Sequence, residues 1–117
     1  MDELLEQSLL YDFYGELLTE HQRKAYEAYL FEDLSLAEIA EEQGISRQGV
    51  HDMVKRSRKT LQDYEDKLGL VKRFADAKER IGQIRKLTDT SEGLSPEETR
   101  DRFREISKLA SGLLEEF

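Results

Sequence analysis

Hydrophobic residues recur at intervals of three and four along most of the chain, and no stretch alternates with the period of a β-strand. The pattern therefore predicts an all-α protein. A first amphipathic helix is expected over residues 2–18, and a second from the capping-box sequence Thr19-Glu-His-Gln22 to about Phe31. The apolar residues of the first helix at helical spacing are Leu5, Leu9, Phe13 and Leu17, with Leu10 and Tyr14 beside them. The second helix is expected to bury Ala25, Tyr29 and Leu30.

Aromatic residues are concentrated in these two helices. They are Tyr11, Phe13, Tyr14, Tyr26, Tyr29 and Phe31. Aromatic rings can stack on nucleic-acid bases, but their helical spacing favours a role in the core that joins the first helix to the next ones.

The middle of the chain has the parts of a helix-turn-helix. Ser35-Leu-Ala-Glu38 has the form of a capping box, so a short helix is expected to begin there. Gly44 suits the left-handed turn that ends this helix, and Ser46 is the expected N-cap of a longer one that ends near Gly69. A short capped helix, a glycine turn and a longer second helix are what a helix-turn-helix requires. The predicted inner face of the longer helix consists of Val50, Val54, Ser57, Leu61 and Leu68.

Two apolar stripes beyond Gly69 predict a C-terminal helical hairpin. The first comprises Leu70, Phe74, Ala77, Ile81 and Ile84, and the second Phe103, Ile106, Ala110, Leu113 and Phe117. We therefore expect residues 1–68 to form the N-terminal helix and helix-turn-helix unit, and residues 69–117 a hairpin. Two helices cannot cover both stripes completely, so a homodimer through the hairpin is expected. The alternative is that the hairpin packs on its own tri-helical unit.

Charge is distributed unevenly along the chain, whose net charge is −8. Residues 1–46 hold 2 basic and 12 acidic residues, residues 47–86 hold 12 basic and 6 acidic, and residues 87–117 hold 4 basic and 8 acidic. A basic stretch between two acidic ones indicates a local surface that attracts a polyanion, although the acidic flanks would keep affinity modest.

The basic stretch includes the exposed side of the predicted recognition helix, which is the candidate nucleic-acid-binding site. Its residues are Arg47, Gln48, His51, Lys55, Arg56, Arg58 and Lys59. Gln48 and His51 are the candidates for reading base edges, while the cations would meet phosphates. Ordinary solvated surface positions have the same composition, and a tri-helical unit can also serve protein contacts.

Catalytic and metal chemistry find no support in the sequence. There are no cysteines, and the two histidines, His21 and His51, fall on different predicted helices without convergent carboxylates. No nucleophile–base pair or glycine-rich phosphate loop is present, so we expect no enzyme and no cofactor. No apolar run approaches the roughly 20 residues of a membrane span, and the N-terminus lacks a signal-peptide pattern, which favours a cytoplasmic protein.

Three motifs resemble known proteins. Leu18-Thr-Glu-His-Gln-Arg23, Ser35-Leu-Ala-Glu-Ile-Ala40 and Gly44-Ile-Ser46 resemble region 4 of the sigma-70 family. A more specific likeness, over about the first two-thirds of the chain, is to the YlxM family of helix-turn-helix proteins. Its motifs here are Leu10-Tyr-Asp-Phe-Tyr-Gly-Glu-Leu-Leu18, Tyr26-Glu-Ala-Tyr29 and Arg47-Gln-Gly-Val-His-Asp52.

The resemblance implies a DNA-binding regulatory protein with a sigma region 4-like fold. YlxM-like proteins are encoded beside signal-recognition-particle genes, so the resemblance also implies a role in that pathway or its regulation. The alternatives are an accessory factor that binds signal-recognition-particle RNA or protein, and a protein-interaction module. Because 117 residues leave no room for region 2, we do not expect an intact sigma factor.

Overall fold

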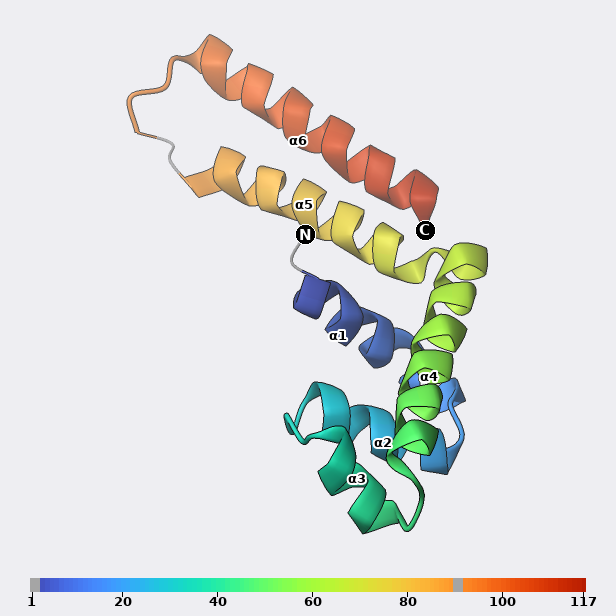
Figure 1. Cartoon of the computed structure of the whole chain (residues 1–117). Helices are drawn as coiled ribbons and strands as arrows, with labels where there is room; N and C mark the ends of the chain where they lie inside the picture. Colours follow the sequence, from blue (N-terminus) through green and yellow to red (C-terminus); the bar gives the residue numbers. More distant parts are fainter. Residues whose placement is uncertain (1–2, 90–91) are drawn as a thin grey trace. The chain divides into compact units, whose positions relative to one another are not determined.

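The computed structural model describes residues 3–89 and 92–117, which form six α-helices, one 3-10 helix and no strand. The elements are α1 (Glu3–Tyr14), η1 (Gly15–Leu17), α2 (Glu20–Leu30), α3 (Leu36–Gln43), α4 (Arg47–Leu68), α5 (Leu70–Asp89) and α6 (Pro96–Glu116) (Figure 1). The predicted all-α class is confirmed. The chain divides into two compact units, Met1–Val71 and Lys72–Phe117. No helix in the described ranges is long and apolar enough to cross a membrane.

Side-chain caps begin four of the helices. Each cap oxygen accepts a hydrogen bond from the backbone N–H three residues on, and the cap residues are Thr19, Ser35, Ser46 and Ser95. Thr19 and Ser35 form full capping boxes, in which Gln22 and Glu38 accept in return from the cap backbone. The helix starts predicted at Thr19, Ser35 and Ser46 are confirmed.

Two glycines end helices by taking a left-handed backbone conformation. Gly44 has φ 68° after α3 and Gly69 has φ 63° after α4. A side chain is strained at such angles, which is why glycine is favoured there. The turn of the predicted helix-turn-helix is therefore present between α3 and α4.

The core of the first unit lies against α4, which contacts α1, α2 and α3 (Figure 1). Its inner face buries Val50, Val54, Ser57 and Leu61. Leu68, predicted on the same face, is instead 49% exposed because it is the last residue of the helix. The fully buried neighbours on other helices include Tyr14, Tyr26 and Ile39.

The buried face of α1 differs from the one that the spacing predicted. Leu10 and Tyr14 are buried, whereas Leu5, Phe13 and Leu17 are 39% to 55% exposed. The helix ends at Tyr14 and gives way to η1, so the interval of four does not continue to Leu17. Leu10 and Tyr14, each offset by one residue from the predicted set, pack into the core, and Leu9 of that set is partly buried against it.

The aromatic residues join the core only in part. Tyr14 and Tyr26 are buried, and Tyr11 is half-buried with its ring stacked on Tyr26 at 6.0 Å between centroids. Tyr29, expected in the core of α2, is 39% exposed, because α2 buries Ala25, Tyr26 and Ala28. Phe13 and Phe31 are exposed as well.

A buried polar cluster holds the first residues of α5 to the first unit. The Tyr14 hydroxyl donates to Glu65 Oε1 at 2.6 Å and accepts from the Leu70 N–H at 3.2 Å. The same Glu65 oxygen accepts from the Val71 N–H at 3.0 Å. These contacts supply partners for backbone donors in the first turn of α5, which no helical carbonyl can reach.

The second unit is an antiparallel pair of α5 and α6 (Figure 1). The Arg80 guanidinium lies 3.3 Å from the Glu116 carboxylate, and Arg102 donates to the Leu87 carbonyl at 3.3 Å. None of the residues of α6 is buried. The predicted hairpin is therefore present.

Candidate nucleic-acid interface

The turn between α3 and α4 fixes how the recognition helix begins. The Ile45 N–H donates to the Ala40 carbonyl at 3.1 Å, which closes the turn around Gly44. Ser46 Oγ accepts from the Gly49 N–H at 2.9 Å. A Cβ at Gly49 would lie 3.1 Å from that same oxygen, so the absence of a side chain keeps the cap close.

All seven residues of the predicted site are exposed on α4. They are Arg47, Gln48, His51, Lys55, Arg56, Arg58 and Lys59. The helix has 22 residues, so it is about 33 Å long at 1.5 Å per residue. α1 packs near its C-terminal half, where the Tyr14 and Tyr64 rings stack at 5.9 Å between centroids. The site residues lie between the first residue of α4 and Lys59, ahead of Tyr64.

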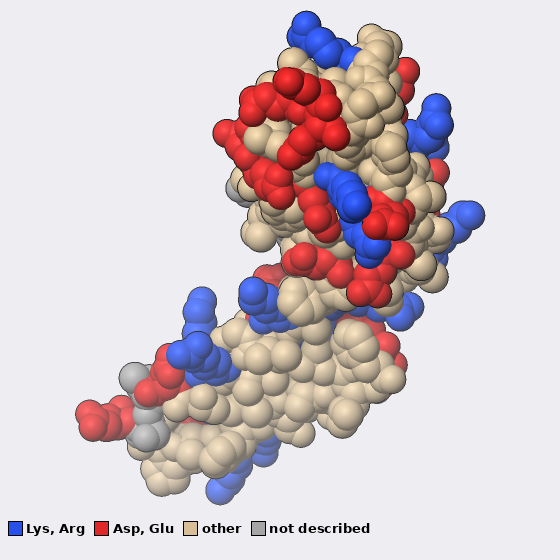
Figure 2. All heavy atoms as spheres, turned by 90° about the horizontal axis from the view of Figure 1, so that it is seen from below, with Lys and Arg blue, Asp and Glu red and all other residues tan. Residues whose placement is uncertain are grey.

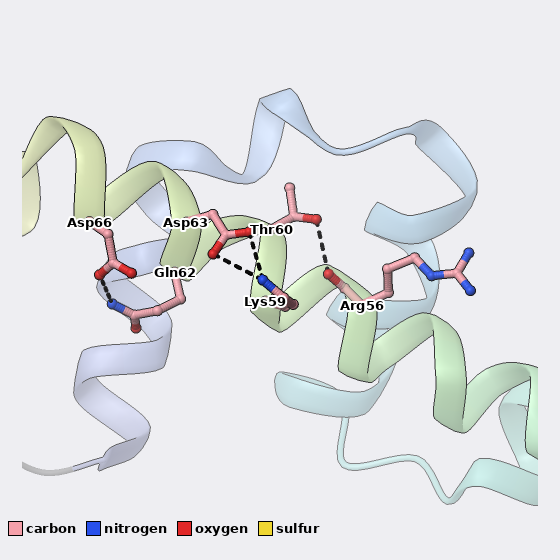
Figure 3. Close-up of polar contacts among 6 residues, drawn as sticks. All are labelled: Arg56, Lys59, Thr60, Gln62, Asp63 and Asp66. Carbon is pink, nitrogen blue, oxygen red and sulfur yellow. Dashed lines mark hydrogen bonds and ion pairs between the residues drawn. The ribbon is translucent and has the colours of Figure 1, made fainter.

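Carboxylates on the outer side of α4 engage some of these residues. Lys59 Nζ lies 3.1 Å from Asp63 Oδ2, as Figure 3 shows. Gln48 donates to Asp52 at 3.1 Å, and His51 Nδ1 lies 3.6 Å from the same carboxylate oxygen. Exposed pairs of this kind are worth only about 0.3–0.5 kcal/mol, so a phosphate or a base could displace them. The Asp63 charge would nevertheless remain beside Lys59.

The other cations have no such partner. Within residues 3–89 and 92–117, no ion pair engages Arg47, Lys55, Arg56 or Arg58. The Arg56 guanidinium points away from the other labelled residues in Figure 3, while its carbonyl accepts from Thr60 Oγ1 at 2.9 Å. These four charges can therefore meet a polyanion without first breaking a salt bridge.

A hollow of about 280 Å³ adjoins the inner edge of this basic surface. It is lined by Tyr29 of α2, Leu36 of α3 and, from α4, His51, Val54, Lys55 and Arg58. The sequence analysis did not connect Tyr29 or Leu36 with the site, because only the packing of α2 and α3 on α4 brings them there. No feature of the sequence indicates this, because the helical spacing predicted that Tyr29 would be buried.

Acidic side chains gather elsewhere on the first unit. Figure 2 shows a dense acidic group on the face of that unit seen there. The α2 and α3 helices carry exposed carboxylates at Glu20, Glu38, Glu41 and Glu42. This distribution repels a polyanion from these helices and leaves α4 as the favourable side of the unit.

Metal binding has no candidate among the described residues, which contain no cluster of three or more histidine, aspartate or glutamate side chains suited to an ion. His21 and His51 lie on α2 and α4 and line different surface hollows.

Comparison with known proteins supports a helix-turn-helix assignment. The model of the UPF0122 family, described as "Putative helix-turn-helix protein, YlxM / p13 like", matches residues 1–100. A UPF0122 protein of Thermoanaerobacter sp. (strain X514) is 43% identical over 115 residues, which are 98% of this chain and 93% of the relative. One of Desulforamulus reducens is 47% identical over 98 residues, or 83% and 84% of the two chains. One of Bacillus thuringiensis is 38% identical over 109 residues, or 93% and 98%.

Proposed function

Since this chain belongs to the UPF0122 family of YlxM/p13-like helix-turn-helix proteins, we propose that it is a regulatory protein that binds double-stranded DNA. The part of α4 from Arg47 to Lys59 enters the major groove. The observation that carries the proposal is a set of exposed cations on the recognition helix that no ion pair engages in the part of the chain that the structure describes, namely Arg47, Lys55, Arg56 and Arg58.

Groove dimensions favour DNA over double-stranded RNA. The major groove of B-form DNA is about 12 Å wide and admits an α-helix. The major groove of A-form RNA is deep and too narrow for side chains on a helix to read. A straight helix that carries its contacts on successive turns fits the first groove and not the second.

The residues of α4 divide into two roles in this proposal. The four unpaired cations contact phosphates and set affinity, with Arg47 beside the first turn of the helix. Gln48 and His51 contact base edges and set the sequence preference, once their contacts with Asp52 are broken. Lys59 contributes less, because Asp63 offsets its charge.

Selection of bound fragments from a genomic DNA library and from total RNA, in parallel, tests the proposal. We expect enrichment of a DNA sequence, and we expect Gln48→Ala and His51→Ala to weaken the selected site by about 1–3 kcal/mol with little effect on random DNA. Lys108→Ala, on α6, is the control and should change the affinity neither for the selected site nor for random DNA. Enrichment confined to RNA would contradict the proposal.

A further inference from the structure

The hollow beside α4 has the size of a binding site for a small group. Its volume is about 280 Å³, and three helices contribute to it. Sites for drug-sized ligands are commonly about 300–1,000 Å³, so this one is at the lower limit. It can hold one compact polar group and leave the remainder of a larger ligand outside.

The charge of its lining selects anions. His51, Lys55 and Arg58 follow one another at intervals of four and three, so they share one side of α4. Tyr29 adds a phenol from the facing helix, and none of the described residues that line the hollow is acidic. A cationic concavity without a carboxylate is what an anionic group requires.

A buried hydroxyl next to this lining lacks a partner. Tyr26 is fully buried, and its Oη makes no hydrogen bond to a described residue. Burial raises the pKa of Tyr26, and the Arg58 side chain opposes that rise.

We propose that this hollow seats one phosphoryl group, held by Lys55 and Arg58, with a hydrogen bond from Tyr29. The inference rests on the proposed function, under which the phosphoryl group is a single backbone phosphate of bound DNA. This contact would fix the register of α4 in the groove, because a phosphate contact positions a protein on DNA without reading its sequence. A free phosphorylated molecule has the same chemistry and is the other source.

Titration with inorganic phosphate tests the seat without DNA. In amide NMR spectra at constant ionic strength, we expect saturable shifts at residues 29, 51, 55 and 58. Lys55→Gln with Arg58→Gln should abolish them, whereas Arg56→Gln, which removes one charge of α4 outside the hollow, should leave them unchanged. Shifts that do not saturate, or that persist equally in the Lys55/Arg58 variant, would overturn the seat.

A series of DNA duplexes identifies the source of the phosphoryl group. Each duplex carries one neutral methylphosphonate in place of a phosphate, at a different position of the selected site. One position should weaken wild-type and Arg56→Gln binding at least tenfold more than it weakens the Lys55/Arg58 variant, because that variant has already lost the contact. Equal losses in all three proteins at every position would overturn the backbone assignment. Saturable phosphate binding without any DNA binding would refute the proposed function and assign the seat to a free phosphorylated molecule.

Discussion

Glu65 and Tyr14 connect α1, the end of α4 and the start of α5 through two side chains. The Tyr14 hydroxyl both donates to Glu65 and accepts from the Leu70 backbone. Because the phenol is almost fully buried, water cannot replace either bond when it is removed. This pair therefore contributes to the stability of the first unit.

Tyr14→Phe should lower the free energy of unfolding by about 1–3 kcal/mol, the cost of leaving buried hydrogen-bonding groups unsatisfied. Urea denaturation followed by circular dichroism measures this. Tyr29→Phe removes a hydroxyl that makes no hydrogen bond to the described residues, so it should change stability little. Equal effects of the two variants would show that the Tyr14 bonds do not matter.

Stability should fall at alkaline pH through the same residue. Burial raises the pKa of Tyr14 above its usual value of 10.0, and the hydrogen bond to Glu65 raises it further. The unfolded chain therefore loses this proton at a lower pH than the folded one. The stabilising contribution is complete below pH 10 and is lost as pH rises through the folded-state pKa.

Unfolding free energies measured from pH 8 to 11.5 would check this dependence. The decrease should be steeper for wild type than for Tyr14→Phe, which has no phenol to ionise at this position. Parallel curves would contradict the assignment.

Helix boundaries could be predicted from the sequence because their causes are local. Ser35, Ser46 and Ser95 cap helices through their own backbone neighbours, and Gly44 and Gly69 end them through their own φ angles. The buried face of α1 could not be predicted in this way. Its apolar residues allow two faces offset by one residue, and the contacts of Tyr14 with Tyr64 and Glu65 of α4 select one of them.

The exposed residues of the candidate site could be predicted from the sequence, but the hollow beside them could not. Helical periodicity identified the exposed side of α4, and all seven residues predicted there are exposed. The hollow depends on Tyr29 and Leu36, which come from other helices and whose place follows only from packing. The ion pair of Lys59 could be predicted from the sequence, because Asp63 is one helical turn away on the same helix.

Asp63→Asn should strengthen DNA binding because it releases Lys59 (Figure 3). Asp66→Asn is a matched control, since it removes the same charge from α4 where only Gln62 donates to the carboxylate. The released pair is worth about 0.3–0.5 kcal/mol, so Asp63→Asn should bind about twofold more tightly than Asp66→Asn by fluorescence anisotropy. Identical affinities would mean that Lys59 does not approach the DNA.

For the whole molecule, the second unit bears more apolar surface than its two helices cover. Figure 2 shows a broad area without charged side chains over the hairpin, in the lower part of the view. Phe103 and Leu114 of α6 are 67% and 80% exposed, and the C-terminal Phe117 is 75% exposed. We propose that a second copy of the chain covers this surface, as an apolar patch of this kind is a usual mark of an interface. Two half-sites would then be bound together.

Light scattering at micromolar concentration should give twice the monomer mass of 13.7 kDa. Phe103→Lys with Leu114→Lys should return the mass to that of the monomer while the helical circular dichroism is kept. Leu5→Lys, at an exposed leucine of α1, should leave the dimer intact. A monomeric wild type would refute the dimer, and dissociation by Leu5→Lys alone would move the interface to the N-terminal helices.

The salt dependence of DNA affinity tests the central claim most directly. Each phosphate contact that is lost should lower the slope of log affinity against log salt by about 0.9. A variant with Lys55, Arg56 and Arg58 changed to Gln should therefore bind more weakly than wild type, with a slope that is smaller by about 2–3. The control variant, with Arg100, Arg104 and Lys108 of α6 changed to Gln, removes the same number of charges and should keep the wild-type slope. Equal slopes for wild type and the α4 variant would contradict the account.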